Sequence, residues 1–162
     1  MNLWKSNKHS NLLQIKIIEM EGKYMVPCGK NGFKVKKDDT YVPIKNLEEF
    51  SFNIDSNIET TYLYDLQGFQ RALKTGLGFT LDCSCKREFS DPGQESIMST
   101  AYVLGEEANR EFKIEWADGS SIEFTGVVAV SSLGGGAVTD IMTLEFSVTV
   151  DGLITETPSA GE

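Results

Sequence analysis

Apolar and polar residues alternate over much of this chain, which is typical of β-strands that have one dry and one wet face. The segment 142–150 shows this pattern without interruption, and Asp151–Gly152 after it is a turn signal. Its apolar positions are Met142, Leu144, Phe146, Val148 and Val150, and its polar positions are Thr143, Glu145, Ser147 and Thr149. β-Rich segments elsewhere predict further strands over 12–18, 23–26, 33–44, 49–55, 58–66, 79–87, 111–116 and 121–130.

Short turn signals separate several of these strands. Ser56–Asn57 lies between two β-rich segments and predicts a hairpin, and Asp118–Gly119 predicts a second turn. Phe69 and Leu73 lie four residues apart and are followed by Gly76, which favours one or two helical turns between the strands.

One segment has a clear helical period. Asp91 is a suitable N-cap, Pro92 suits the first helical position, and Gly105 stands where a C-cap glycine belongs. The apolar positions at helical spacing between them are Ile97, Met98, Ala101 and Tyr102. The pattern predicts an amphipathic helix of about three turns over residues 92–104.

Together these elements predict a mainly β fold, a β-sandwich or open barrel, with one flanking α-helix at about residues 92–104. The length of 162 residues suits one domain with a real core. We expect a flexible N-terminal arm over 1–10, a single domain over 11–153, and a disordered tail over 154–162. No apolar run reaches the length of a membrane span, and no secretory signal is expected.

The three cysteines, Cys28, Cys83 and Cys85, are an odd number, which favours free thiols in a reducing compartment. The inner face predicted for the strand 79–87 carries Phe79, Leu81, Cys83 and Cys85. Because His9 is the only histidine, we expect the cysteines to pack as small apolar residues and predict no metal site.

Three consecutive glycines, Gly134 to Gly136, could suggest a phosphate-binding loop. Such a loop needs a helix N-terminus after it, and a strand pattern follows here instead. The glycines are better explained as a loop or bulge between two strands, where the backbone needs positive φ.

The chain carries 24 acidic residues against 15 lysines and arginines, for a net charge of −9. Because nucleic-acid binding depends on Lys and Arg that neutralise phosphates, this balance argues against a protein that grips DNA. It suits a surface that keeps polyanions from sticking.

No catalytic constellation is evident. A Ser/His or Cys/His pair would need His9, which lies in a polar terminal stretch, and the adjacent carboxylates fall in charged turns. We therefore predict no enzyme, no catalytic residue and no cofactor.

The extended region 46–68 is unusually apolar for a hairpin, with Tyr62, Tyr64 and Leu66 near its end. Exposed apolar arms template pairing with other chains, so the region is a candidate for assembly. The alternative is a hairpin folded back on its own core.

Three strings carry a resemblance to a known family. They are EEFSFNIDSNIETTYLYDLQGFQRALKTG, LDCSCKREFSDPGQESIMSTAYVLG and FKIEWADGSSIEFTGVVAVSSLGGGAVTDIMTLEFSVTVDG, which together span most of residues 41–152. In this order they resemble the major tail tube proteins of long, non-contractile phage tails, or of phage-derived tail-like particles. Ser90 stands where family members often have Gly before Asp-Pro, and the residues before 41 match only loosely.

The resemblance implies a structural subunit that forms hexameric rings, which stack into a hollow tube for DNA passage during ejection. It implies a location in the virion tail after assembly in the host cytoplasm. The implied partners are other copies of the chain and the tail tip or initiator, tape measure and terminator proteins. DNA would pass without specific binding, and no membrane is involved.

The resemblance also assigns candidate contacts between subunits or rings. They are Asp55, Glu59, Tyr62, Tyr64, Leu66, Phe69, Arg71, Gly134, Gly135 and Gly136. Candidate lumen-facing acids, which would repel DNA weakly, are Asp82, Glu123 and Glu145.

Two alternatives remain open at this stage. One is the tube subunit of a contractile injection system or tailocin, which shares the architecture. The other is a monomeric β-sandwich binding module with an aromatic platform, although core packing explains Trp116 better than a platform does.

Overall fold

The computed structural model describes residues 27–159, and the chain divides into two compact units, 1–31 and 32–162. In the first unit the described part is a short 3₁₀ helix, η1 (Cys28–Lys30). The predicted strands 12–18 and 23–26 and the predicted arm 1–10 lie outside the described residues. The predicted domain bounds therefore stay a prediction.

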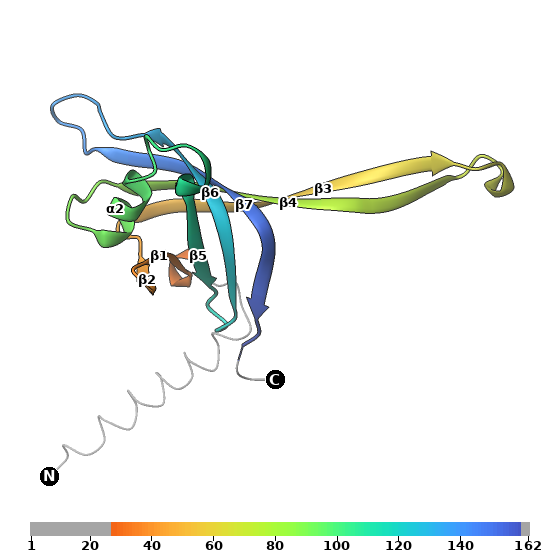
Figure 1. Cartoon of the computed structure of the whole chain (residues 1–162), viewed down its shortest axis with the longest axis horizontal. Helices are drawn as coiled ribbons and strands as arrows, with labels where there is room; N and C mark the ends of the chain where they lie inside the picture. Colours follow the sequence, from red (N-terminus) through yellow and green to blue (C-terminus); the bar gives the residue numbers. More distant parts are fainter. Residues whose placement is uncertain (1–26, 160–162) are drawn as a thin grey trace, which may run out of the picture. The chain divides into compact units, whose positions relative to one another are not determined.

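The second unit contains one seven-stranded antiparallel sheet with the strand order β2-β1-β5-β6-β7-β4-β3 (Figure 1). Its strands are β1 (Gly32–Lys37), β2 (Thr40–Pro43), β3 (Leu47–Tyr62), β4 (Gln70–Lys86), β5 (Asn109–Glu115), β6 (Ser121–Ser132) and β7 (Thr143–Thr157). The predicted turn at Asp118–Gly119 is confirmed between β5 and β6, where Gly119 has φ +88°.

Stacked phenylalanine rings show how this sheet curls around its core. Phe33 on β1 lies 5.8 Å from Phe50 on β3, although these strands stand near opposite ends of the strand order. Phe112 bridges Phe33 and Phe124 at 5.4 and 5.7 Å between ring centroids. The sheet therefore folds over itself, and the predicted β-sandwich or open barrel is confirmed.

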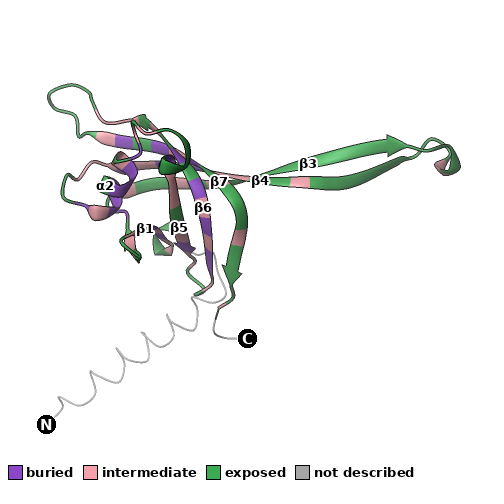
Figure 2. Cartoon of the chain, in the orientation of Figure 1, coloured by how far each residue is buried: buried purple, intermediate pink, exposed green. Residues whose placement is uncertain are grey.

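The alternation of the sequence accounts for the core. Leu81, Cys83 and Cys85 of β4 are buried on the same face, as predicted, and Phe79 is half-buried. Burial raises the pKa of Cys83, and it raises the pKa of Cys85 to about 11, so both thiols are neutral at pH 7. They pack as small apolar side chains. Figure 2 shows the buried residues gathered in the curled sheet and α2.

The helix is shorter than predicted. α2 (Pro92–Met98) ends at Ser99, whose hydroxyl donates to the Ser96 carbonyl, and Thr100 Oγ1 donates to the Ile97 carbonyl. These side-chain bonds compete with further helical bonding. Gly105 is not the C-cap: it has φ +72° and begins a separate 3₁₀ helix, η3 (Gly105–Ala108). The Asp91 cap is confirmed, because Asp91 Oδ2 accepts from the Gln94 backbone N–H at 2.9 Å.

The predicted hairpin turn at Ser56–Asn57 is wrong. β3 runs through these residues with a bulge between Asn57 and Ile58, and the chain reverses only after Tyr62. The reversal contains the 3₁₀ helix η2 (Tyr64–Leu66). The helical turns expected around Phe69 and Leu73 are also wrong, because β4 begins at Gln70. Pairing along the whole length of both strands overrides these local signals.

The final strand is longer than predicted. β7 does not turn at Asp151–Gly152 but passes through it, with Gly152 at φ +88°, and pairs with β6 as far as Thr157. The register shift beside Gly152 marks a bulge rather than a turn. Residues 154–157 are therefore strand and not part of a disordered tail.

Candidate assembly surfaces

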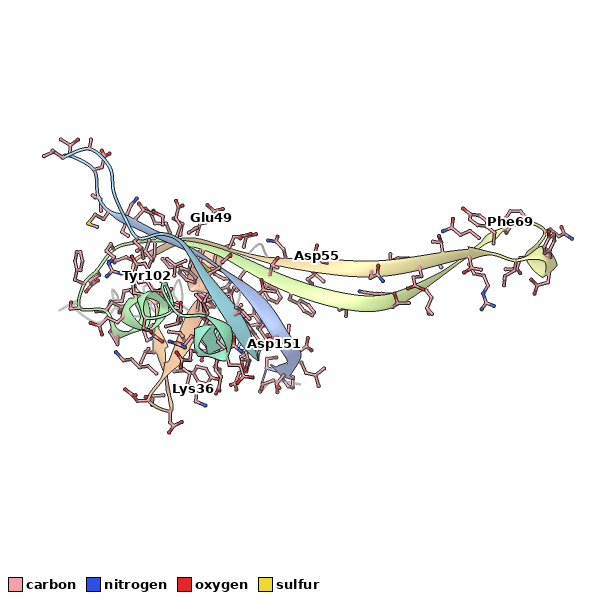
Figure 3. All side chains as sticks on the ribbon, turned by 45° about the horizontal axis from the view of Figure 1, so that its top comes forward. Lys36, Glu49, Asp55, Phe69, Tyr102 and Asp151 are labelled. Atoms are coloured by element: carbon pink, nitrogen blue, oxygen red, sulfur yellow. The ribbon has the colours of Figure 1, made fainter. Side chains whose placement is uncertain are left out.

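The most prominent feature of the second unit is a two-stranded arm. β4 pairs with β7 only from Thr80 to Lys86, so from Gln70 to Phe79 its partner is β3 alone. We call residues 54–79 the hairpin arm. It extends away from the curled sheet, with Asp55 near its base and Phe69 near its tip (Figure 3).

One face of the hairpin arm continues the apolar face of the core. The register places Ile54, Ile58 and Tyr62 on the same side as Phe50 and Phe52. In the arm these side chains are exposed, with Ile58 at 58% and Tyr62 at 67%. The alternative of a hairpin folded back on its own core is therefore wrong.

The other candidate residues of this region divide between the second face and the tip. Asp55, Glu59 and Arg71 lie on the second face, opposite Tyr62. Tyr64 and Phe69 are exposed at the tip, whereas Leu66 is half-buried. The structure thus gathers these residues in one arm but not on one surface. Their role as contacts stays a prediction.

The three glycines lie in the loop 133–142 between β6 and β7, with φ values of +103°, +156° and +139°. A Cβ on Gly136 would stand 2.8 Å from Asp140 Oδ2, which also accepts from the Ala137 backbone N–H. The strand β7 follows the loop, so the interpretation as a bent connection between core strands is confirmed. The contact of this loop with another subunit stays a prediction.

Two of the three candidate lumen acids lie close together on the polar face of the sheet. Asp82 pairs with Ser147 across β4 and β7, and Ser84 pairs with Glu145 two residues along. Glu49, which the sequence did not single out, stands opposite Ser84 on β3. Glu49, Asp82 and Glu145, here called the acidic patch, line a shallow hollow of about 420 Å³. No lysine or arginine lines it.

Glu123 lies in a different electrostatic setting. Its carboxylate forms a salt bridge with Lys113 at 2.9 Å and accepts from the Tyr41 hydroxyl at 3.4 Å. The Lys113 ammonium lowers the pKa of Glu123. Neighbouring carboxylates on β5 are paired in the same way, Glu115 with Lys34 and Glu111 with Lys36. The polar face is therefore neutralised around β1 and β5 and acidic around β3, β4 and β7.

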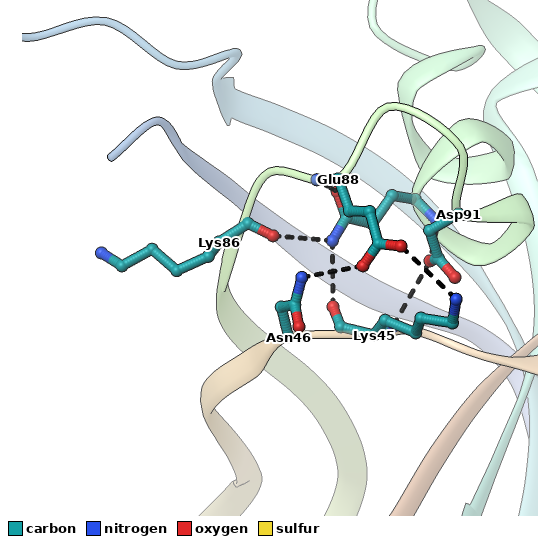
Figure 4. A network of polar contacts seen from close by, with 6 residues as sticks. Lys45, Asn46, Lys86, Glu88 and Asp91 are labelled. Atoms are coloured by element: carbon teal, nitrogen blue, oxygen red, sulfur yellow. Dashed lines mark hydrogen bonds and ion pairs between the residues drawn. The ribbon is translucent and has the colours of Figure 1, made fainter. Parts of the chain in front are cut away.

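A buried glutamine that the sequence analysis missed fixes α2 to the sheet. The Gln94 side chain is fully buried; its Nε2 donates to the carbonyls of Lys45 and Lys86 at 2.9 and 2.8 Å, and its Oε1 accepts from the Glu88 backbone N–H at 2.8 Å (Figure 4). Asp91 Oδ2 also accepts from the Lys45 backbone N–H. The Asp-x-x-Gln spacing matches a capping box and so signals a helix start, but it does not predict these three bonds of the Gln94 amide.

The described part of the chain contains neither a metal-binding cluster nor a helix that could span a membrane. Among residues 27–159, no group of three or more His, Cys, Asp or Glu is arranged to hold a metal ion. No helix in that range is long and apolar enough to cross a membrane.

Comparison with known proteins gives a likeness in structure rather than in sequence. No family model and no curated protein sequence matches the chain. The tail of an empty gene transfer agent particle, refined with C6 symmetry, matches with a TM-score of 0.64 at 11% identity, covering 83% of this chain and 100% of that one. The SPP1 tail tube matches with a TM-score of 0.59 at 12% identity, covering 82% and 78%.

A tube of the contractile type has the same fold. A chain of the sheath–tube complex of PVC, an extracellular contractile injection system, matches with a TM-score of 0.60 at 11% identity, covering 86% of this chain and 96% of that one. The fold expected from the resemblance is therefore confirmed: this chain has the fold of tail tube proteins from phages and phage-derived particles.

Proposed function

We propose that this chain is a tail tube subunit. Copies assemble into hexameric rings that stack into a hollow tube in the virion tail, and DNA passes through this tube during ejection. The subunit acts as a structural protein and not as an enzyme.

The observation that carries this proposal is the hairpin arm on a tail tube fold. A two-stranded ribbon is at best marginally stable in water, yet this one presents an exposed apolar face and an aromatic tip. A partner that covers this face would bury its apolar side chains and stabilise the two-stranded ribbon. In a self-assembling tube the partner is another copy of the chain.

The polar face of the sheet supports the conduit part of the proposal. If this face lines the channel, the acidic patch lies toward the DNA, which carries one negative charge per roughly 1.7 Å. Weak repulsion from Glu49, Asp82 and Glu145 keeps the DNA from being gripped. Glu123 contributes less, because Lys113 neutralises it.

The partners of such a subunit are other copies of itself, a tail tip or initiator complex, a tape measure protein and a terminator. Assembly takes place in the host cytoplasm.

Negative-stain electron microscopy of the purified protein, with light scattering over a concentration series, tests the proposal. Six-fold rings or hollow tubes are expected, if necessary after addition of tail tip complexes as initiators. A protein that stays monomeric at all concentrations and with initiators would contradict the proposal and favour the monomeric binding module.

Charge reversal tests the conduit. Glu145→Lys should leave tube assembly intact and slow DNA ejection from reconstituted particles, because it turns repulsion into attraction. Glu123→Lys is the matched comparison and should slow ejection less. Equal ejection rates for the wild type and Glu145→Lys would argue against this face as the channel lining.

The tube of a contractile injection system is a second candidate, favoured by the likeness to the PVC tube chain. Co-assembly of its tubes with the sheath protein of a contractile injection system would support it. Tubes that remain bare in the presence of that sheath protein would support the non-contractile tail.

A further inference from the structure

The loop 133–142 between β6 and β7 is braced by its own side chains. Asp140 Oδ2 accepts from the Ala137 backbone N–H at 2.8 Å, and the Asp140 backbone N–H donates to the Ala137 carbonyl at 2.9 Å. The Met142 side chain packs over Gly134, where a Cβ would stand 2.6 Å from the Met142 methyl carbon. Because glycine leaves room for this side chain, the loop has a defined shape in the single subunit.

The braced loop presents two aliphatic side chains to water. Val138 is fully exposed and Ile141 is 69% exposed, and we call this pair the loop tip. The loop projects beyond the ends of β6 and β7 (Figure 1). Its single charge is Asp140, whose carboxylate is bonded within the loop. An ordered loop that holds apolar side chains away from the core is typical of a contact with a partner.

An apolar groove of about 620 Å³ lies between η3 and β6. Leu104 at its side is 91% exposed, so the groove is open in the second unit. β5 pairs with β6 no further than Val127, which leaves the adjoining edge of β6 unpaired on this side within the described residues. No lysine or arginine of the described range lines the groove, and its apolar lining includes Val103, Leu104, Ala108 and residues 127–130.

We propose that this groove receives the loop tip of a second copy. Val138 and Ile141 enter the apolar floor, and the loop backbone at Gly135, which has open space around it, approaches the unpaired edge of β6. The occupant comes from another copy, because the braces formed by Asp140 and Met142 hold the tip away from its own groove. The tip carries no free charge and the groove has no cation, so the two surfaces match in polarity.

This contact joins two different surfaces, so it is heterologous. A copy that has placed its loop in a neighbour still has its own groove free, and the contact propagates from copy to copy. The contact rests on the proposed tube and adds to it an interface that does not involve the hairpin arm.

Amide hydrogen exchange below the assembly concentration tests the brace. The N–H groups of Ala137 and Asp140 are bonded within the loop, so they should exchange at least about tenfold more slowly than the N–H of Val138. Asp140→Ala should remove the protection at Ala137. Equally fast exchange at all three positions of the wild type would overturn the preformed tip.

A double-mutant cycle tests the contact. Val138→Ser/Ile141→Ser removes the apolar tip, and Leu104→Ser weakens its receptor. Each variant should raise the concentration needed for tube formation about tenfold, because apolar burial at the contact is lost. The thermal unfolding of the monomer should change little, since all three side chains are exposed. Combined, the substitutions should again raise that concentration about tenfold rather than about a hundredfold, because both remove the same interaction.

A matched control uses Leu153, a leucine of β7 that is 93% exposed and lies outside the groove. Leu153→Ser combined with the tip variant should give the product of the two separate effects. A product for the groove variant as well, or no effect of the tip or groove variant alone, would overturn the contact.

A disulfide test decides between the outcomes if a serine variant fails to fold. In a Cys28→Ser background, Val138→Cys with Leu104→Cys should give a ladder of cross-linked multimers under oxidation, and either cysteine alone should give at most dimers. A cross-link within one chain would overturn the second copy as the occupant, and cross-linked dimers alone would overturn the propagating contact. Tubes without any cross-link would overturn the groove contact but leave the proposed function intact. A ladder without hollow tubes would support the contact and count against the tube.

Discussion

Leu81 and Leu77 lie on the same strand, on the same face and four residues apart, yet Leu81 is fully buried and Leu77 is 56% exposed. The difference begins at Thr80, where β7 ceases to pair with β4. From Thr80 to Lys86, β4 pairs with β7, and the sheet continues through further strands that curl over the face of Leu81. On the other side two strands continue alone. One alternating pattern can therefore form both a buried core and an exposed arm within a single strand.

The largest expected effect comes from removal of the arm. Deletion of residues 58–75 joins Asn57 directly to Gly76, and the flanking residues Ser56 and Leu77 are already paired. Asn-Gly is the preferred sequence for a two-residue hairpin loop, so the shortened ribbon should close without strain. We expect a folded monomer with an unchanged melting temperature and complete loss of tube assembly. Tube formation by this variant would show that assembly does not need the arm.

The two leucines provide the next test. Leu81→Ala should lower the free energy of unfolding of the monomer by about 2–5 kcal/mol, because it leaves a cavity in a closed core. Leu77→Ala should cost less than about 1 kcal/mol in the monomer, since water already reaches the side chain. Urea denaturation of both variants measures the difference. Similar losses would mean that the arm face is covered in the free subunit.

Gln94→Ala tests the anchor of α2 within the body of the fold. The substitution leaves two backbone carbonyls and one backbone N–H without their partner, and we expect a loss of about 2–3 kcal/mol in unfolding free energy. The neighbouring Glu95→Ala is the control, because its ion pair with Lys37 is half-exposed and contributes less than about 1 kcal/mol. Equal losses for the two variants would contradict the anchoring role.

The smallest effect concerns the neutralised part of the polar face. Because Lys113 lowers the folded-state pKa of Glu123 below its ordinary value of 4.5, this pair stabilises the fold above that pH. The contribution is lost as the pH falls through the folded-state pKa. Glu123→Gln should therefore flatten the dependence of unfolding free energy on pH between about pH 5 and pH 3. Lys113→Gln removes the same ion pair from the other side and should flatten the slope in the same way.

Several elements could be predicted because their signals are local. Asp91 caps α2 through a bond to a residue three positions away, and Gly119 provides positive φ within its own turn. In the same way, the strand pattern directly after the three glycines was a local signal, and it was enough to exclude a phosphate-binding loop. Of the candidate acids, Asp82 and Glu145 lie on one polar face because strand alternation fixes the side of each residue.

Other features were wrong or missed because they depend on distant partners. Ser56–Asn57 is a good turn signal, but cross-strand pairing from Leu47 to Tyr62 keeps it extended. Gln94 carries no sign in the sequence that its amide will reach the carbonyls of Lys45 and Lys86. Likewise, Glu123 resembles Glu145 in sequence pattern, and only the neighbouring β5 supplies the lysine that neutralises it.

The sequence by itself determined the β class, the polarity of each strand face, the helix start and the unusually apolar hairpin, because periodicity and capping act over a few residues. Only the tertiary structure decided where β7 leaves β4, and hence which part of the apolar face is core and which part is an exposed arm. It also decided which acids are paired with a lysine. These outcomes depend on contacts between strands far apart in the chain, and no local pattern encodes such contacts.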